Sequence, residues 1–234
     1  MSNLFGCSRV LAVGDIHGMY EKLIKLMEQI QFAPGDDLLI FLGDYIDRGP
    51  QSLECVDYVM ALNKQYPERV ICLKGNHEAM CSNYYKYEGH KHSFMSEGND
   101  LQMFLVWLDN GGKDAFRQFK KLKKLELQKR LRWMRMLPNH YQVGNYFFCH
   151  AGVEPYIPLD KQREDDLLWI RKWFIKMYHK DEIIVVGHTP VQHLDFLPVP
   201  QFLDNNIILC DTGSFMDGGK LSCVDVLSKK FWQA

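Results

Sequence analysis

Six short motifs in this chain are built around Asp, His and Asn, residue types that bind divalent metal ions through oxygen and nitrogen. In chain order, they are Gly14-Asp15-Ile16-His17-Gly18, Gly43-Asp44-Tyr45-Ile46-Asp47-Arg48-Gly49, Gly75-Asn76-His77-Glu78, His150-Ala151-Gly152, Gly187-His188-Thr189 and Asp211-Thr212-Gly213. Each motif follows a short apolar run, and any one alone would be weak evidence. Six of them in this order predict a site where two metal ions promote hydrolysis of a phosphate ester.

The motifs place donor groups where they can face the same metal ions. Asp15 and His17 are separated by one residue, and in extended backbone such a pair points the same way. Asp44 follows the next apolar run, and a carboxylate can bridge two cations with its two oxygens. An amide carbonyl and two imidazoles follow three later runs: Asn76, His150 and His188. This oxygen and nitrogen set suits Mn²⁺, Fe, Zn²⁺ or related ions better than a thiolate-rich structural zinc.

Charge indicates which substrate such a site attracts. Two divalent ions, less the carboxylates of Asp15 and Asp44, leave about +2 on the site. Arg48 adds to this charge and can hold a phosphate oxygen through its fork of donors. Two metals roughly 3.5–4 Å apart can clamp the attacking and leaving oxygens of an in-line displacement, and can lower the pKa of bound water towards about 7. A phosphate ester dianion is therefore the expected occupant.

His77 has a position that suits proton transfer. It directly follows the expected ligand Asn76, so it lies beside the metals without having to bind them. There it can act as a general acid that protonates the leaving alkoxide, an effect typically worth roughly 10²–10⁴ in rate. Asp47 is the candidate to orient the His77 ring, as carboxylates commonly do for imidazoles.

Short strands and intervening helices must position these groups. Runs of four to six residues rich in Val and Ile and closed by Gly or a motif predict buried strands. Strand, motif and helix in repeated succession predict an α/β fold, in which the carboxyl ends of neighbouring strands converge on one rim. We expect a single domain over residues 1–234. The expected strands are Val10–Val13, Leu38–Leu42, Val70–Leu73, Tyr146–Cys149, Ile183–Val186 and Ile207–Cys210, and helical spacing appears over Tyr20–Ile30 and Leu53–Leu62.

Two segments interrupt this pattern. Tyr84–Asp100 is rich in aromatic residues, His and Gly, and we expect a long loop there. Lys113–Arg135 carries ten basic and two acidic residues, so its charge is +8 and the rest of the chain carries -9. Apolar residues recur among these cations, which predicts a solvated helix face packed by its apolar side. Steering of anionic substrates, or contact with an acidic membrane or partner, are alternative functions for this segment.

Bulk properties exclude several classes of protein. The formal net charge of -1 argues against a dedicated nucleic-acid binder. The seven cysteines are scattered without a C-x-x-C pair, and three lie in apolar runs as expected for reduced core residues. The first residues show no secretory signal, and no apolar run approaches the length of a membrane span. We therefore expect a soluble, cytoplasmic protein whose oligomeric state the sequence does not indicate.

At these motifs the chain resembles the metal-dependent PPP family of serine/threonine phosphatases, within the calcineurin-like metallophosphoesterases. The similarity extends from about Arg9 to Gly213 and is greatest to short bacterial and bacteriophage members of the lambda type. It implies two packed mixed β-sheets flanked by helices, with a dimetal site at strand carboxyl ends. It also implies the following roles: Asp15, His17 and Asp44 at one metal; Asp44, Asn76, His150 and His188 at the other; His77 as proton donor with Asp47 as its partner; and Arg48 and Arg171 as phosphate ligands.

Some of these residues also have ordinary structural interpretations. Arg171 could be only a cation on a helix surface, although the resemblance favours a phosphate ligand. Asp211-Thr212-Gly213 is expected to be a turn that shapes the site rather than a ligand. The metal-like spacing of His90-Lys91-His92 lies in a polar loop, where an unspecialised loop is the better interpretation. His179 and His193 are expected to be surface residues.

The leading functional hypothesis is a phosphatase for phosphoserine and phosphothreonine, with phosphotyrosine as a further substrate, using in-line attack of a metal-bound hydroxide. Mn²⁺ is the expected metal, and Fe, Zn, Ni or Co would also suit the donors. The main alternative is a symmetrical diadenosine tetraphosphate hydrolase, which would cleave a phosphoanhydride. A non-catalytic scaffold is disfavoured because no expected ligand is missing. A nuclease or cyclic-nucleotide phosphodiesterase is disfavoured by the Asp47-Arg48-Gly49 continuation, on resemblance.

Overall fold

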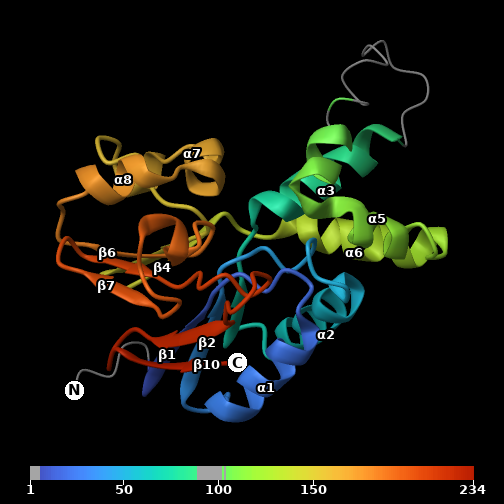
Figure 1. Ribbon diagram of the computed structural model, residues 1–234. Helices are drawn as coiled ribbons and strands as arrows, with labels where there is room; N and C mark the ends of the chain where they lie inside the picture. The colour runs from blue at the N-terminus through green and yellow to red at the C-terminus, as the bar shows by residue number, and fades with distance from the viewer. Residues whose placement is uncertain (1–5, 89–101, 103) are drawn as a thin grey trace.

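Two five-stranded β-sheets pack face to face, and each carries helices on its outer side (Figure 1). The computed structural model describes residues 6–88, 102 and 104–234. The first sheet has the strand order β10-β9-β1-β2-β3, and the second has the order β4-β5-β6-β8-β7. Both are mixed. In the first sheet β1, β2 and β3 are parallel, and β9 and β10 join antiparallel beyond β1. In the second sheet β5, β6 and β8 are parallel, and β4 and β7 are antiparallel edge strands. The predicted fold class is therefore confirmed.

The elements alternate along the chain much as the sequence predicts. The first sheet contains β1 (Arg9–Val13), β2 (Asp37–Phe41), β3 (Val70–Cys72), β9 (Ser222–Asp225) and β10 (Lys230–Gln233). The second contains β4 (His140–Val143), β5 (Tyr146–Cys149), β6 (Ile183–Val186), β7 (Gln201–Leu203) and β8 (Ile207–Leu209). The main helices are α1 (Tyr20–Ile30), α2 (Ser52–Gln65), α3 (Asn76–Glu88), α5 (Lys113–Phe119), α6 (Lys124–Met136), α7 (Glu164–Trp169) and α8 (Lys172–Met177).

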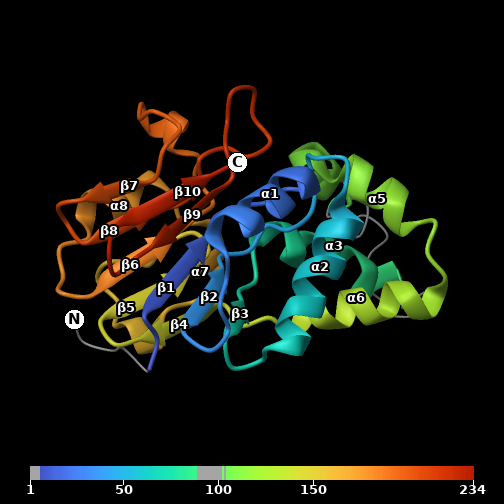
Figure 2. The same cartoon turned by 90° about the horizontal axis from the view of Figure 1, so that it is seen from below.

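Alternation along the central strands divides the apolar residues between three cores. In β1, Leu11 and Val13 face the helices, whereas Val10 and Ala12 face the second sheet. The same alternation holds in the second sheet, where Phe148 faces inward between the sheets. Burial on both faces explains why these strands are continuous apolar runs. Figure 1 shows α7 and α8 on the side of the second sheet, and Figure 2 shows α2, α3, α5 and α6 gathered beside the first.

All six predicted strands are present, while four strands gave no sequence signal. The missed strands are β4, β7, β9 and β10, and each pairs antiparallel with its neighbours. None precedes a motif. The strands β4, β7 and β10 lie at sheet edges, where partial exposure weakens the pattern from which a strand can be predicted. The strand β9 is interior and buried, but it begins with Ser222 and ends with Asp225, so it forms no continuous apolar run.

The two irregular segments differ from expectation in part. The loop predicted at Tyr84–Asp100 is wrong for Tyr84–Glu88, which continue α3 because Tyr84 and Tyr85 pack against the buried ring of Trp107. The rest of that segment, including His90-Lys91-His92, lies outside the described residues. The basic segment forms two helices, α5 and α6, which bury Phe119 and Met134 among others and leave most of their cations exposed. Its predicted amphipathic helical character is confirmed.

Further expectations from the bulk composition can be compared with the fold. All seven cysteines are buried, as expected for core residues. Across the helices of the described ranges, none combines the length and apolarity that crossing a bilayer requires.

The contact between the two sheets should dominate stability. Phe148 is fully buried in the inter-sheet core, so Phe148→Ala should lower the free energy of unfolding by about 3–5 kcal/mol through lost burial and a residual cavity. Urea denaturation would measure this loss. Leu125→Ala provides the control, because Leu125 is 79% exposed and its truncation should change stability by less than about 0.5 kcal/mol. Equal losses in both variants would contradict the assignment of the core.

Candidate metal centre

The expected site residues lie in loops that leave the carboxyl ends of parallel strands. Asp15 and His17 follow β1, Asp44 follows β2, and Asn76 begins α3 just after β3. His150 and His188 follow β5 and β6 of the second sheet. The structure thus gathers groups from both sheets at one rim, as the α/β topology predicts. All six residues are at most 5% exposed.

The backbone at this rim is unusually strained. Nine non-glycine residues of the described chain have positive φ, and five are expected site residues: His17, Asp44, Asp47, Arg48 and His188. Such conformations cost of order 1–3 kcal/mol each and persist only where the surroundings fix them. They also correct one expectation. Asp15 and His17 do approach, with Oδ2 and Nε2 3.9 Å apart, but His17 has φ 49° and lies in a turn rather than in extended backbone.

Two groups of side chains could each hold a metal ion, and they share one carboxylate. The first consists of His17, Asp44 and His77, and the second of Asp44, His150 and His188. Asp44 Oδ2 lies 3.5 Å from His17 Nε2 and 3.4 Å from His150 Nε2. Asp15 joins the first group through its 3.9 Å approach to His17. The shared position of Asp44 is what a bridging ligand requires.

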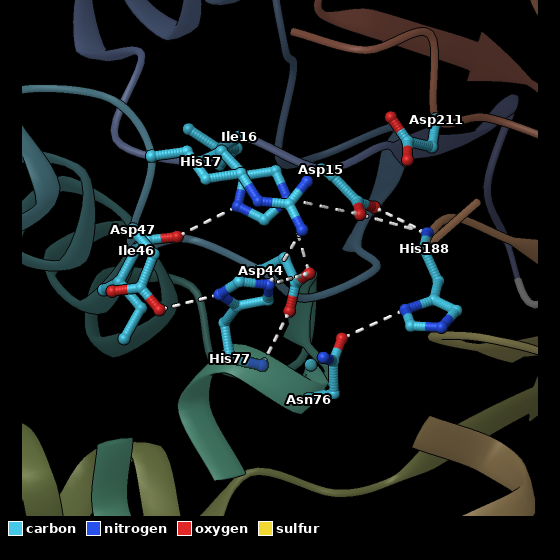
Figure 3. Close-up of polar contacts among 12 residues, drawn as sticks. Asp15, Ile16, His17, Asp44, Ile46, Asp47, Asn76, His77, His188 and Asp211 are labelled. Carbon is cyan, nitrogen blue, oxygen red and sulfur yellow. Dashed lines mark hydrogen bonds and ion pairs between the residues drawn. The ribbon is translucent and has the colours of Figure 1, made fainter. Parts of the chain in front are cut away.

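The second group contains acceptor atoms that a cation would satisfy. His150 Nδ1 donates to the carbonyl of Leu42 at 2.9 Å, so its Nε2 carries a lone pair. That Nε2 lies 2.9 Å from Asn76 Oδ1 and 3.1 Å from His188 Nδ1, with 3.0 Å between the last two atoms (Figure 3). Three such atoms in mutual contact share at most one proton. His188 Nε2 is also buried, and no described residue forms a hydrogen bond with it. A divalent cation fits this donor set.

The first group has the same character. His17 Nδ1 donates to the carbonyl of Ile46 at 3.0 Å, which leaves the Nε2 lone pair directed towards the oxygens of Asp15 and Asp44. Burial lowers the pKa of His17 well below its ordinary value, so the ring is neutral. Burial, together with the nearby Asp211 and Asp44 carboxylates, raises the pKa of Asp15 well above its ordinary value. Without positive charge, these groups repel one another, and metal binding would relieve that repulsion.

His77 and Asp47 form a buried pair beside the shared carboxylate. His77 Nδ1 donates to Asp47 Oδ2 at 2.7 Å, and His77 Nε2 lies 3.8 Å from Asp44 Oδ2 (Figure 3). Burial lowers the pKa of His77, but the Asp44 and Asp47 carboxylates raise it by more, so the net shift is upward. The ring is thereby oriented with Nε2 facing the centre, and its proton-bearing form is favoured.

Both expected arginines lie at this centre. Arg48 Nη2 is 3.3 Å from His77 Nε2, and its guanidinium stacks 4.2 Å from the centre of the Phe215 ring. Arg171 Nη1 lies 3.4 Å from the carbonyl oxygen of His188, so it approaches from the second sheet. Arg171 is an exposed residue that immediately precedes α8, but its guanidinium is turned towards His188 and Thr189 rather than lying along a helix surface. An anion between the two arginines would be held from both sides.

Glu78 is a site residue to which sequence reasoning gave no role. Its carboxylate accepts the backbone N–H groups of Asp44 at 2.8 Å, Tyr45 at 2.9 Å and Gly75 at 3.0 Å, with Ile46 at 3.4 Å. One buried side chain thus joins the loop after β2 to the loop after β3. The signal was available, because Glu78 ends the Gly75-Asn76-His77-Glu78 motif.

Two aromatic residues at the site have no sequence signal of their own. The indole N–H of Trp107 donates to Asp47 Oδ2 at 2.8 Å, although Trp107 lies in no motif. Phe215 contacts the His17 ring edge-on, with centroids 5.0 Å apart. Phe215 lies just beyond Asp211-Thr212-Gly213, where the Gly213 N–H donates to Asp211 Oδ1 at 2.9 Å. The Asp211 side chain thus closes a turn over Thr212, and the backbone turn itself follows at Ser214 and Phe215.

Comparison with known proteins identifies the family. The family model described as calcineurin-like phosphoesterase matches residues 8–210. The chain belongs to the calcineurin-like phosphoesterase family. It is therefore a phosphoesterase hydrolase, and members of this family use a dimetal site, in agreement with the two His and Asp groups that share Asp44.

Individual relatives differ in their named activities. The chain is similar to a serine/threonine-protein phosphatase PP2A-like PPG1 of Candida albicans, with 44% identity over 72 residues, 31% of the chain and only 17% of that relative. A crystal structure described as a "putative diadenosine tetraphosphatase" has TM-score 0.69 and 22% identity, covering 100% of this chain and 95% of that one. A Saccharomyces cerevisiae serine/threonine phosphatase similar to human PP5 has TM-score 0.63 and 16% identity, covering 94% and 74%. These structural similarities show the fold.

Charge repulsion in the metal-free centre yields a stability prediction. A carboxyl whose pKa is higher in the folded than in the unfolded protein lowers stability above its folded pKa, and this penalty disappears below its unfolded pKa. Because the pKa of Asp15 is raised, Asp15→Asn should increase the melting temperature of the metal-free protein at neutral pH. Mn²⁺ at about 100 times its Kd should stabilise the original protein by about 2.7 kcal/mol and the variant by much less.

Differential scanning calorimetry with chelator and with Mn²⁺ would measure both effects. Asp160→Asn is the matched control, because Asp160 lies in the exposed 3₁₀ turn at Leu159–Lys161. A lower melting temperature for Asp15→Asn in chelator, or an undiminished gain with Mn²⁺, would contradict the metal-ligand role.

Proposed function

We propose that this protein is a metal-dependent phosphoprotein phosphatase that hydrolyses phosphoserine, phosphothreonine and also phosphotyrosine monoesters. The observation that carries this proposal is the His77–Asp47 pair beside Asp44, with Arg48 in contact. When a phosphoserine or phosphothreonine ester is hydrolysed, the departing group is a strongly basic alkoxide that needs a proton. When a phosphoanhydride is hydrolysed, the departing group is a phosphate, which needs little protonation. A built proton donor therefore favours a monoester substrate.

The proposal assigns the metal ligands to two sets. Asp15, His17 and Asp44 would hold one ion, and the shared Asp44 would hold the second with Asn76, His150 and His188. Mn²⁺ suits these oxygen and nitrogen donors, as would Fe, Zn, Ni or Co. When bound, the two ions would supply the Lewis-acid polarisation of the phosphate and the acidification of water that this chemistry needs.

The protein groups then act around the phosphate. Arg48 and Arg171 would bind its oxygens, because their guanidinium groups approach the centre from different sheets. Water forms a new bond to phosphorus as the ester P–O bond breaks, and the bonding electron pair remains on the departing oxygen. His77 would donate its Nε2 proton to that oxygen, while Asp47 holds Nδ1 and stabilises the imidazolium before transfer.

Similarity to a protein phosphatase supports a phosphoprotein substrate, but this similarity covers only part of the chain. The chain matches the PP2A-like phosphatase at 44% identity over 72 residues, which span 17% of that relative. A cold-active protein-tyrosine phosphatase of Shewanella shares the fold with TM-score 0.60 and 18% identity. A single catalytic domain over residues 1–234, acting in the cytoplasm with its cysteines reduced, is part of the same proposal.

A symmetrical diadenosine tetraphosphate hydrolase is the second candidate. The structure described as a "putative diadenosine tetraphosphatase" covers the whole of this chain. In addition, Trp169 is 40% exposed, and its ring centroid lies 6.4 Å from that of His188. An exposed indole at the rim of the centre can stack on a nucleobase. This observation favours a substrate that carries bases.

Direct competition between the two substrates would separate these candidates. Protein stripped of metal and reloaded with Mn²⁺ should hydrolyse a phosphoserine peptide with higher kcat/KM than diadenosine tetraphosphate, and chelator should abolish both activities. Released phosphate and nucleotide products would be quantified by chromatography. Dominant cleavage of the dinucleotide into two equal halves would transfer the assignment to the second candidate.

Removal of the proton donor gives a second test. His77→Asn should lower kcat for the phosphoserine peptide by about 10²–10⁴, because the alkoxide would depart unprotonated. His193→Asn is the control, since His193 is exposed in a 3₁₀ turn away from the named ligands and should retain full activity. Full turnover by metal-loaded His77→Asn would show that the acid has been assigned wrongly.

A further inference from the structure

A kinked turn, Leu108–Gly112, joins two helical stretches and lies directly against the loop that carries Asp47 and Arg48. The backbone N–H of Arg48 donates to the carbonyl of Gly111 at 3.0 Å. Gly111 has φ 103°, and a Cβ there would lie 2.6 Å from Arg48 Cγ, so only glycine allows this approach. The turn is therefore fitted to this loop.

Trp107, the residue immediately before this turn, contacts Asp47 in the same loop. Its indole N–H donates to Asp47 Oδ2 at 2.8 Å, and His77 Nδ1 donates to the same oxygen at 2.7 Å. Among the described residues, none forms a hydrogen bond with the second oxygen, the buried Asp47 Oδ1. Within that part of the chain, the side chains that orient the carboxylate, Trp107 and His77, both do so through Oδ2.

The Trp107 ring is itself held firmly. It is fully buried among aromatic side chains, with ring centroids 5.8 Å from Tyr84 and 6.2 Å from Phe116. Gly112 lets the backbone pass close to the indole, since a Cβ there would lie 2.6 Å from Nε1. Because the packed indole ring has no space in which to move, its N–H keeps a fixed direction and can orient the Asp47 carboxylate that it contacts.

Asp47 needs such support because its own backbone does not favour the observed geometry. Asp47 and Arg48 are consecutive non-glycine residues with φ 72° and 66°. Residues in this conformation remain there only when neighbouring structure holds them. Trp107 holds the side chain of Asp47, and Gly111 holds the backbone of Arg48, so one segment of chain fixes both residues.

We propose that Trp107 is a positioning residue for proton transfer, acting through Asp47 to aim the His77 imidazole at the leaving-group oxygen. This inference rests on the proposed function, because it assigns a role within the same reaction. Loss of the indole N–H leaves the Asp47 carboxylate bonded to His77 without the fixed donor beside it, so the carboxylate and the His77 ring can move together and the ring loses its fixed direction. The phosphate-binding groups and metal ligands keep their contacts.

This role predicts a dependence on the leaving group. An ester with a basic leaving group requires the His77 proton, whereas one with an acidic leaving group departs without it. With Mn²⁺-loaded protein, Trp107→Phe should lower kcat/KM for phenyl phosphate by about tenfold, and by less than about twofold for 2,4-dinitrophenyl phosphate. A general structural defect would lower both rates by the same factor.

A matched control is available within the same helical layer. Trp133 also donates its indole N–H to a side chain, Asn63 Oδ1 at 3.5 Å, and its ring contacts Tyr45. Over the described ranges it forms no hydrogen bond with Asp47 or His77. Trp133→Phe should leave the ratio of the two rates unchanged. If Trp107→Phe does not fold, incorporation of benzothienylalanine at position 107 keeps the bicyclic ring and replaces only the N–H by sulfur.

A second measurement needs neither metal nor turnover. In the metal-free protein, NMR should show the Trp107 indole N–H exchanging slowly with solvent, and Asp47→Asn should change its chemical shift as the anionic acceptor is lost. Fast exchange, or an equal loss of rate on both esters in Trp107→Phe, would overturn the positioning role. If the unaltered protein cleaves neither ester, the proposed function itself fails, and that outcome is distinct from the others.

Discussion

Four backbone N–H groups converge on the carboxylate of Glu78, and the geometry of the metal centre depends on this interaction. These groups belong to the loop after β2, which carries Asp44, and to Gly75 in the loop before α3. A buried carboxylate without such donors would be strongly unfavourable, and the N–H groups would be unsatisfied without the carboxylate. These hydrogen bonds hold the two loops together. They thereby fix the position of Asp44, the carboxylate that both proposed metal sites share.

The centre also exists only where the two sheets meet. Asp15 and Asp44 come from the first sheet, whereas His150 and His188 come from the second. Contacts cross this boundary directly: the His188 backbone N–H donates to Asp15 at 3.0 Å, and His150 donates to the Leu42 carbonyl at 2.9 Å. The inter-sheet core therefore has a catalytic consequence, because loss of packing there would separate the two halves of the ligand set.

Stability and function oppose each other at this rim. Buried carboxylates and imidazole lone pairs face one another, and five of the expected site residues have strained backbone. The apolar cores on both faces of each sheet offset these costs, and metal binding would remove part of them. The support is layered: Asp47 holds His77, while Trp107 and the turn at Leu108–Gly112 hold Asp47 and Arg48. Pre-organised chemistry of this kind requires an outer layer of contacts as much as the reacting groups.

The sequence by itself predicted the six strands that precede motifs, their α/β arrangement and the expected ligands, because buried apolar runs and metal-binding motifs are local patterns. The packing of two mixed sheets was expected only from resemblance to a known family. The sequence also predicted that Asp15 and His17 approach each other, although for the wrong backbone reason. Tertiary structure decided the antiparallel strands, the left-handed conformations, the convergence on Glu78 and the placement of Arg171 beside His188. Trp107 shows the limit most clearly. It is separated from Asp47 by 60 residues, and only the folding of the helical layer brings its indole N–H to that carboxylate. Contacts between distant segments carry no signature in either segment alone.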